Sequence, residues 1–155
     1  MTKEKKIAYF TVFLGFLIPL IYVLVPVVHM IGSGDISEGL RLEFIFMNLL
    51  YFWGCFFIAT VLYAFVRASA VTGAALATLS LFIFFAIPTG DAKGDGAMWM
   101  VYLVWCIAAG FVSIFPALLK PQFMQKSWLR ATICSALLTY SSFIVGLVGF
   151  KLFDQ

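Results

Sequence analysis

The chain has 155 residues, of which 64% are hydrophobic and 11% are charged, and its formal net charge is +3 at pH 7. Soluble domains carry about 25% charged residues, and a soluble protein of this size could not cover the apolar surface of 18 phenylalanines. The composition therefore predicts an all-α polytopic membrane protein, a single membrane domain over residues 1–155 whose surroundings are the lipid bilayer. The few basic residues lie beside apolar stretches, where they face lipid headgroups, so nucleic acid is not an expected partner.

Five apolar stretches follow one another along the chain, at residues 7–31, 43–66, 70–88, 97–119 and 128–150. An α-helix crosses a hydrocarbon core of ~30 Å with about 20 residues. The first stretch is longer than the apolar part of a secretory signal, which has about 7–15 residues, so we expect an uncleaved first helix. Pro19 and Pro26 lie within it. They predict either a bent helix that fills a bundle or an opened backbone that lines a path.

The basic residues set the expected orientation, because cytoplasmic loops are enriched in lysine and arginine. If the N-terminus is cytoplasmic, the inner side holds Lys3, Lys5, Lys6, Arg67, Lys120, Lys126 and Arg130. All acidic residues except Glu4 then lie outside. If the third stretch did not cross, the basic connection at 120–130 would lie on the wrong side. The pattern therefore predicts a bundle of five transmembrane helices, with the N-terminus cytoplasmic and the C-terminus outside, in a bacterial inner (plasma) membrane.

Small residues form stripes on three of the five stretches. In the last stretch their spacing alternates between three and four residues, which keeps them on one helix face: Thr132, Ser135, Thr139, Ser142, Gly146 and Gly149. The third stretch carries a shorter stripe made of Ala70, Gly73, Ala77 and Ser80, and the fourth carries Cys106, Gly110, Ser113 and Ala117. Lipid is as apolar as leucine, so small residues in a membrane helix mark the side that another helix approaches. We expect these stripes to be helix-packing seams.

A second group of residues gathers at the predicted outer ends of the helices and is a candidate ligand site: His29, Met30, Met47, Asn48, Met98 and Met100. Thioethers and an imidazole are ligands that suit Cu(I), and His29, Met98 and Met100 are the predicted metal ligands. The alternative is that the methionines fill gaps in the packing and that His29 lies at the membrane interface. Asn48 is either a ligand contact or the donor of a hydrogen bond between helices. Nothing else in the sequence requires a cofactor.

No catalytic arrangement is visible in the sequence. The middle of every apolar stretch lacks Asp, Glu, Lys and Arg, the residues that mark proton relays and ion paths in membranes. Hydroxyl groups such as those of Ser113 and Ser135 have no neighbouring general base in sequence. Cys55, Cys106 and Cys134 lie in apolar stretches without a C-x-x-C spacing, so we expect packing residues. We therefore predict that the protein is not an enzyme.

Three functions remain open. The first is a non-catalytic integral membrane protein that acts through intramembrane helix contacts, as a small accessory subunit of a membrane complex or as an immunity-type protein. The second is a small oligomeric transporter or channel for an uncharged solute, with Ser135, Thr139 and Ser142 lining a neutral path. The third is a membrane protein that binds copper at its outer face. The expected partner is therefore another membrane protein or further copies of this chain.

Overall fold

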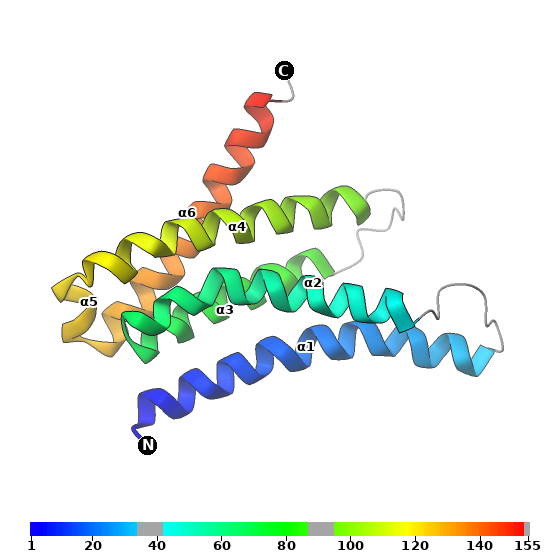
Figure 1. Ribbon diagram of the computed structural model, residues 1–155, viewed down its shortest axis with the longest axis horizontal. Helices are drawn as coiled ribbons and strands as arrows, with labels where there is room; N and C mark the ends of the chain where they lie inside the picture. Colours follow the sequence, from blue (N-terminus) through cyan, green and yellow to red (C-terminus); the bar gives the residue numbers. More distant parts are fainter. Residues whose placement is uncertain (34–41, 87–94, 154–155) are drawn as a thin grey trace.

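The computed structural model describes residues 1–33, 42–86 and 95–153, apart from some side chains within the helices. These residues are all-helical (Figure 1), which confirms the all-α part of the predicted fold class. The elements in chain order are α1 (Lys3–Ser33), α2 (Leu42–Thr60), the 3-10 helix η2 (Val61–Phe65), α3 (Ala68–Ala86), α4 (Asp95–Leu119), α5 (Gln122–Lys126) and α6 (Trp128–Phe153).

Each apolar stretch coincides with one long helix over the residues described, and α1 continues as a single helix through both of its prolines. The second stretch is not α-helical to its end. The Thr60 hydroxyl donates a hydrogen bond of 2.7 Å to the Phe56 carbonyl, and the helix tightens into η2 directly afterwards. Such back-bonding by threonine competes with the regular helix bonds and often bends a helix. The basic connection at 120–130 also differs from the loop expected, because it contains the short helix α5.

The end of α4 has a local cause. Lys120 has a φ of 42°, the left-handed conformation that often ends a helix, and its N–H donates to the Pro116 carbonyl at 3.0 Å. Pro121 follows and cannot continue the helix hydrogen bonding. These residues turn the chain into α5 and from there into α6.

Two helical segments among the described residues are long and apolar enough to cross a membrane. They are Lys3–Val25, with a mean hydropathy of 2.3, and Trp128–Val145, with a mean hydropathy of 1.3. Only 28% and 22% of these segments are buried within the protein, whereas the core helix of a soluble protein is mostly buried. Shorter apolar helical segments are found at Phe52–Phe65, Ala68–Phe84 and Val104–Leu119. The two long segments indicate association with a membrane.

Helix α3 lies at the centre of the bundle and contacts the other four long helices. The most extensive contact joins α3 and α6, and α6 also packs on α4, α1 on α3, and α2 on α4. Figure 1 shows the N-terminus, the turn from η2 to α3, and α5 at one end of the bundle. The C-terminal part of α6, drawn in red, extends past α4 and away from the other helices (Figure 1).

The largest apolar cluster lies where α1, α2, α3 and α4 meet. Phe52 and Phe82 are its aromatic centre, with ring centroids 5.3 Å apart in an edge-to-face arrangement, a geometry that aromatic pairs prefer. Cys55 and Cys106 are buried in the same cluster, and all three cysteines are free thiols. A smaller cluster at the other end of α3 contains Tyr63 and Met124 with four alanine and valine neighbours from α3 and α6: Ala70, Val71, Ala74 and Ala131.

Candidate functional site

The seams predicted on the third and fifth stretches lie against each other in the contact between α3 and α6. A Cβ atom placed on Gly73 would lie 2.0 Å from the Thr132 carbonyl oxygen and 2.2 Å from Ser135 Oγ. No real side chain fits at such distances, so the backbone of α3 touches α6 directly at this point. Ala70 and Ala77 are buried on the same side of α3. The small residues therefore allow the close approach of two helix backbones.

Hydrogen bonds across the seam are few but well placed. Thr132 Oγ1 lies 3.0 Å from the Ser69 carbonyl of α3 and also 3.0 Å from the Trp128 carbonyl of its own helix. At the other end of the contact the hydroxyls of Ser80 and Tyr140 are 2.5 Å apart. Ser80 is itself exposed, so it marks the edge of the seam.

The remaining seam hydroxyls of α6 bond within their own helix. Ser135, Thr139 and Ser142 are buried and donate to carbonyls three or four residues earlier, at distances of 3.0, 2.8 and 2.7 Å. On the same side of α6, the indole Nε1–H of Trp105 in α4 donates to the Thr139 carbonyl at 3.0 Å. The seam thus changes partner along α6, from α3 at its start to α4 further on.

The stripe of the fourth stretch also meets a neighbouring helix. A Cβ on Gly110 would lie 2.5 Å from the Ile58 side chain of α2, and Cys106 and Ser113 are buried beside it. The Ser113 hydroxyl donates to the Gly110 carbonyl at 2.6 Å. Ala117 is half-buried near the end of the helix.

Two sets of predicted residues fall outside the side chains that the structure describes. Gly146 and Gly149 lie on α6, but their surroundings are not among those described. The same is true of the complete candidate ligand site, which is distributed over α1, α2 and α4: His29, Met30, Met47, Asn48, Met98 and Met100. The copper site therefore stays a prediction.

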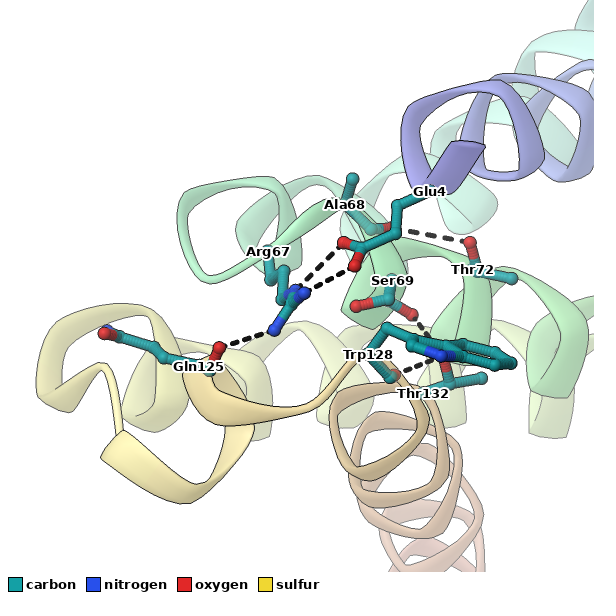
Figure 2. Close-up of polar contacts among 8 residues, drawn as sticks. All are labelled: Glu4, Arg67, Ala68, Ser69, Thr72, Gln125, Trp128 and Thr132. Carbon is teal, nitrogen blue, oxygen red and sulfur yellow. Dashed lines mark hydrogen bonds and ion pairs between the residues drawn. The ribbon is translucent and has the colours of Figure 1, made fainter. Parts of the chain in front are cut away.

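Polar contacts join three separate segments at the end of the bundle that holds the N-terminus. Figure 2 shows the Arg67 guanidinium between Glu4 of α1 and Gln125 of α5. Arg67 Nε donates to Glu4 Oε2 at 2.9 Å, a second nitrogen pairs with Glu4 Oε1, and a third donates to the Gln125 carbonyl. A guanidinium suits this role because its donors form a rigid planar fork. Arg67 thus ties α1 and α5 to the turn before α3.

The charges of this pair stabilise each other. The hydrogen bond from Arg67 lowers the pKa of Glu4 below its usual value, and the same bond raises the pKa of Arg67. Both side chains are about a quarter exposed, so solvent screens part of the attraction. In the sequence, Glu4 is the single acidic residue among the basic ones of the predicted inner side, but nothing there indicates its partner. Its position among three lysines is the sequence feature that could have indicated an ion pair.

Two cavities flank the first turns of α1. One, of about 360 Å³, lies toward the end of α2, η2 and the start of α3, and Lys5, Tyr9 and Ala64 line it. The other, of about 450 Å³, lies toward α3 and α6, and Glu4, Ser69 and Trp128 are among its lining residues. Both volumes fall within the range of small-molecule pockets. Sequence reasoning did not predict either cavity, because both depend on which helices are neighbours.

Comparison with known proteins gives one informative match. The uncharacterized protein PM1189 of Pasteurella multocida (strain Pm70) is 38% identical over 147 residues, which cover 92% of this chain and 94% of the relative. No family model matches the chain, and no solved structure matches it. The two proteins correspond over nearly their full lengths, and the name of the relative states no activity.

Proposed function

This chain belongs to the family of the Pasteurella multocida protein PM1189, and we propose that it is a non-catalytic integral membrane protein that acts through intramembrane helix contacts. In this proposal it spans a bacterial inner membrane five times, with the N-terminus cytoplasmic and the C-terminus outside. Its role is that of a small accessory subunit of a membrane complex, or of an immunity-type protein that blocks a toxin within the bilayer.

The observation that carries the proposal is the division of α6 into two sides. The side of α6 that carries small and hydroxyl-bearing residues packs on α3 and α4. Gly73 of α3 touches its backbone, and Trp105 of α4 donates a hydrogen bond to the Thr139 carbonyl. The other side of α6 presents bulky apolar residues outward, with Leu137 59% and Val145 70% exposed. The end of the helix also extends beyond the rest of the bundle (Figure 1). Such a helix can pack on a partner within the bilayer without disturbing its own fold.

The arrangement of the helix ends supports five crossings. The start of α1, the turn from η2 to α3, and the α5 connection lie at one end of the bundle (Figure 1), and Arg67 joins all three. The helices α1 to α4 therefore run in alternating directions, and α6 starts at the same end as α1 and α3 and crosses α4 at a steep angle (Figure 1). This end also carries the basic residues that the positive-inside rule assigns to the cytoplasm.

The transporter alternative finds less support in the geometry. Ser135, Thr139 and Ser142 lie within helix contacts and bond to their own backbone, and neither described cavity includes them. A neutral path along this stripe would require α6 to separate from α3 and α4. We therefore advance the contact-based function alone.

Site-specific photo-crosslinking in the native membrane tests the proposal. A photoreactive amino acid replaces Leu137 or Ile144 on the outward side of α6, and Phe13 on the exposed side of α1 is the matched control position. We expect a crosslink to a different membrane polypeptide from the α6 positions and none from Phe13. Crosslinks to lipid alone from all three positions would contradict the proposal.

A further inference from the structure

The smaller cavity beside α1 is an apolar groove with a single charged residue at one end. Its volume is about 360 Å³, and it lies between the first turns of α1, η2 with the end of α2, and the start of α3. Its walls include Val12, Phe57, Thr60 and Ala64, and Lys5 and Tyr9 lie toward the N-terminal end of α1. The groove is open along one side, and both Lys5 and Tyr9 are exposed.

The groove exists because α1 is held to the bundle at two separated points. At its start, Glu4 pairs with Arg67. Further along, the Phe56 ring occupies the space of a missing side chain, since a Cβ on Gly15 would lie 2.2 Å from the ring. Between these points the lining includes the small side chains of Ala8, Ala64 and Ala68, beside larger apolar ones such as Val12 and Phe57. The two attachment points therefore lie on either side of the groove along α1.

The groove is complementary to an amphipathic ligand with a negatively charged headgroup. The Thr60 hydroxyl already donates its hydrogen bond to the Phe56 carbonyl, so it does not need a ligand as an acceptor. The carboxylate of Glu4 is engaged by Arg67, and among the described residues Lys5 has no acidic partner. A free ammonium at the mouth of an apolar groove fits a phosphate attached to a hydrocarbon chain.

We infer that this groove binds one anionic phospholipid of the cytoplasmic leaflet, with an acyl chain along Val12 and Phe57 and the phosphate on Lys5. Lys5 and Val12 are seven residues apart on α1, about 10 Å at ~1.5 Å per residue, which fits within one leaflet of a ~30 Å core. Basic pockets between transmembrane helices on the cytoplasmic side are known to hold anionic headgroups. The inference rests on the proposed function only for the orientation of the N-terminus.

The second cavity is less suited to such a lipid. It is lined by Lys3 but also by the Glu4 carboxylate and by the polar residues Ser69, Thr72 and Thr132. An anionic headgroup there would lie beside the Glu4 carboxylate and would compete with it for Arg67. We therefore expect Lys5, but not Lys3, to bind the phosphate of a lipid, although both lysines lie in the first turn of the same helix.

Native mass spectrometry of the purified full-length protein tests the inference. The protein is titrated with phosphatidylglycerol, and separately with phosphatidylcholine that has the same acyl chains. We expect one phosphatidylglycerol to remain bound and phosphatidylcholine to dissociate readily. Lys5→Gln should weaken phosphatidylglycerol binding about tenfold, the effect of losing one charge-assisted hydrogen bond. Lys6→Gln is the matched control, since it removes the same charge from a residue that lines neither cavity, and it should change binding less than twofold.

A second variant tests the groove itself. Ala64→Phe fills part of the groove and leaves every charge in place, so it should also weaken binding of phosphatidylglycerol. Equal losses in Lys5→Gln and Lys6→Gln, equal retention of the two lipids, or unchanged binding in Ala64→Phe would overturn the inference. A copurified polypeptide whose crosslinks map to Tyr9 and Ala64 would also overturn it, because a protein helix would then occupy the groove. Loss of the α6 crosslinks with lipid binding intact would count against the proposed function alone.

Discussion

Gly73 of α3 and Thr132 of α6 touch through their backbones. A Cβ on Gly73 would lie 2.0 Å from the Thr132 carbonyl oxygen, and the Thr132 hydroxyl reaches back to the Ser69 carbonyl at 3.0 Å. Two stripes of small residues that are some sixty positions apart in sequence thus form one contact. The bundle depends on this contact, because α3 also supports α1 and α6 also supports α4.

Replacing Gly73 by alanine should therefore destabilise the bundle. The added methyl group meets the backbone of α6, which cannot yield as a side chain can, and overpacking of this kind costs about 1–3 kcal/mol. We expect a lower melting temperature in detergent. Gly54→Ala is the matched control, because nothing lies within 4 Å of a Cβ at that position and alanine favours the helix over glycine by about 1 kcal/mol. Equal melting temperatures for Gly73→Ala and the unmodified protein would contradict the packing described.

The pair of Glu4 and Arg67 predicts a dependence of stability on acid pH. Arg67 lowers the pKa of Glu4 from its ordinary value of 4.5, so the folded state favours the ionised carboxylate. The resulting stabilisation is complete well above pH 4.5 and is lost as the pH falls through the lowered pKa. Glu4→Gln should lower stability at neutral pH by about 0.2–1 kcal/mol, as for a partly exposed pair. The difference in melting temperature between the variant and the unmodified protein should shrink as the pH falls below 4.5, and a difference that stays constant throughout acid titration would exclude this role.

The buried hydroxyls of α6 allow a test between packing and transport. The triple variant Ser135→Ala, Thr139→Ala, Ser142→Ala removes hydroxyls that bond to carbonyls of their own helix, a local bond that does not tie α6 to its neighbours. We expect a modest loss of stability and unchanged association with partners. Solute uptake by proteoliposomes should be the same with either protein. Uptake by the unmodified protein that disappears in a correctly assembled triple variant would favour the transporter instead.

The orientation of the chain can be tested with reporters at its C-terminus. An odd number of crossings from a cytoplasmic N-terminus puts Gln155 outside, so an alkaline phosphatase fusion should be active and a green fluorescent protein fusion dark. A cysteine in place of Gln122 on α5 should react only with membrane-permeant thiol reagents, because α5 lies at the same end as the N-terminus (Figure 1). An inactive alkaline phosphatase fusion together with a fluorescent green fluorescent protein fusion would show an even number of crossings.

The seam residues could be predicted from the sequence because a helix repeats every 3.6 residues and lipid rewards small residues only where helices touch. The pairing of Gly73 with Thr132 could not, since spacing identifies a helix face but not the helix that it meets. The bond between Glu4 and Arg67 spans 63 positions and depends on how α1 crosses α3. The 3-10 turn after Thr60 depends on a hydrogen bond from the Thr60 hydroxyl to the Phe56 carbonyl, and a hydropathy pattern does not contain this information. The grooves beside α1 follow from these same contacts.

We propose that the protein acts through contacts with another membrane protein. The most direct measurement is the mass of the protein extracted gently from its native membrane, by native mass spectrometry. We expect a complex that contains a different polypeptide. This complex should survive the triple hydroxyl variant but be weakened by charged substitutions at Leu137 and Ile144 on the outward side of α6. A species that contains this chain alone, as a monomer or as identical copies, would contradict the claim.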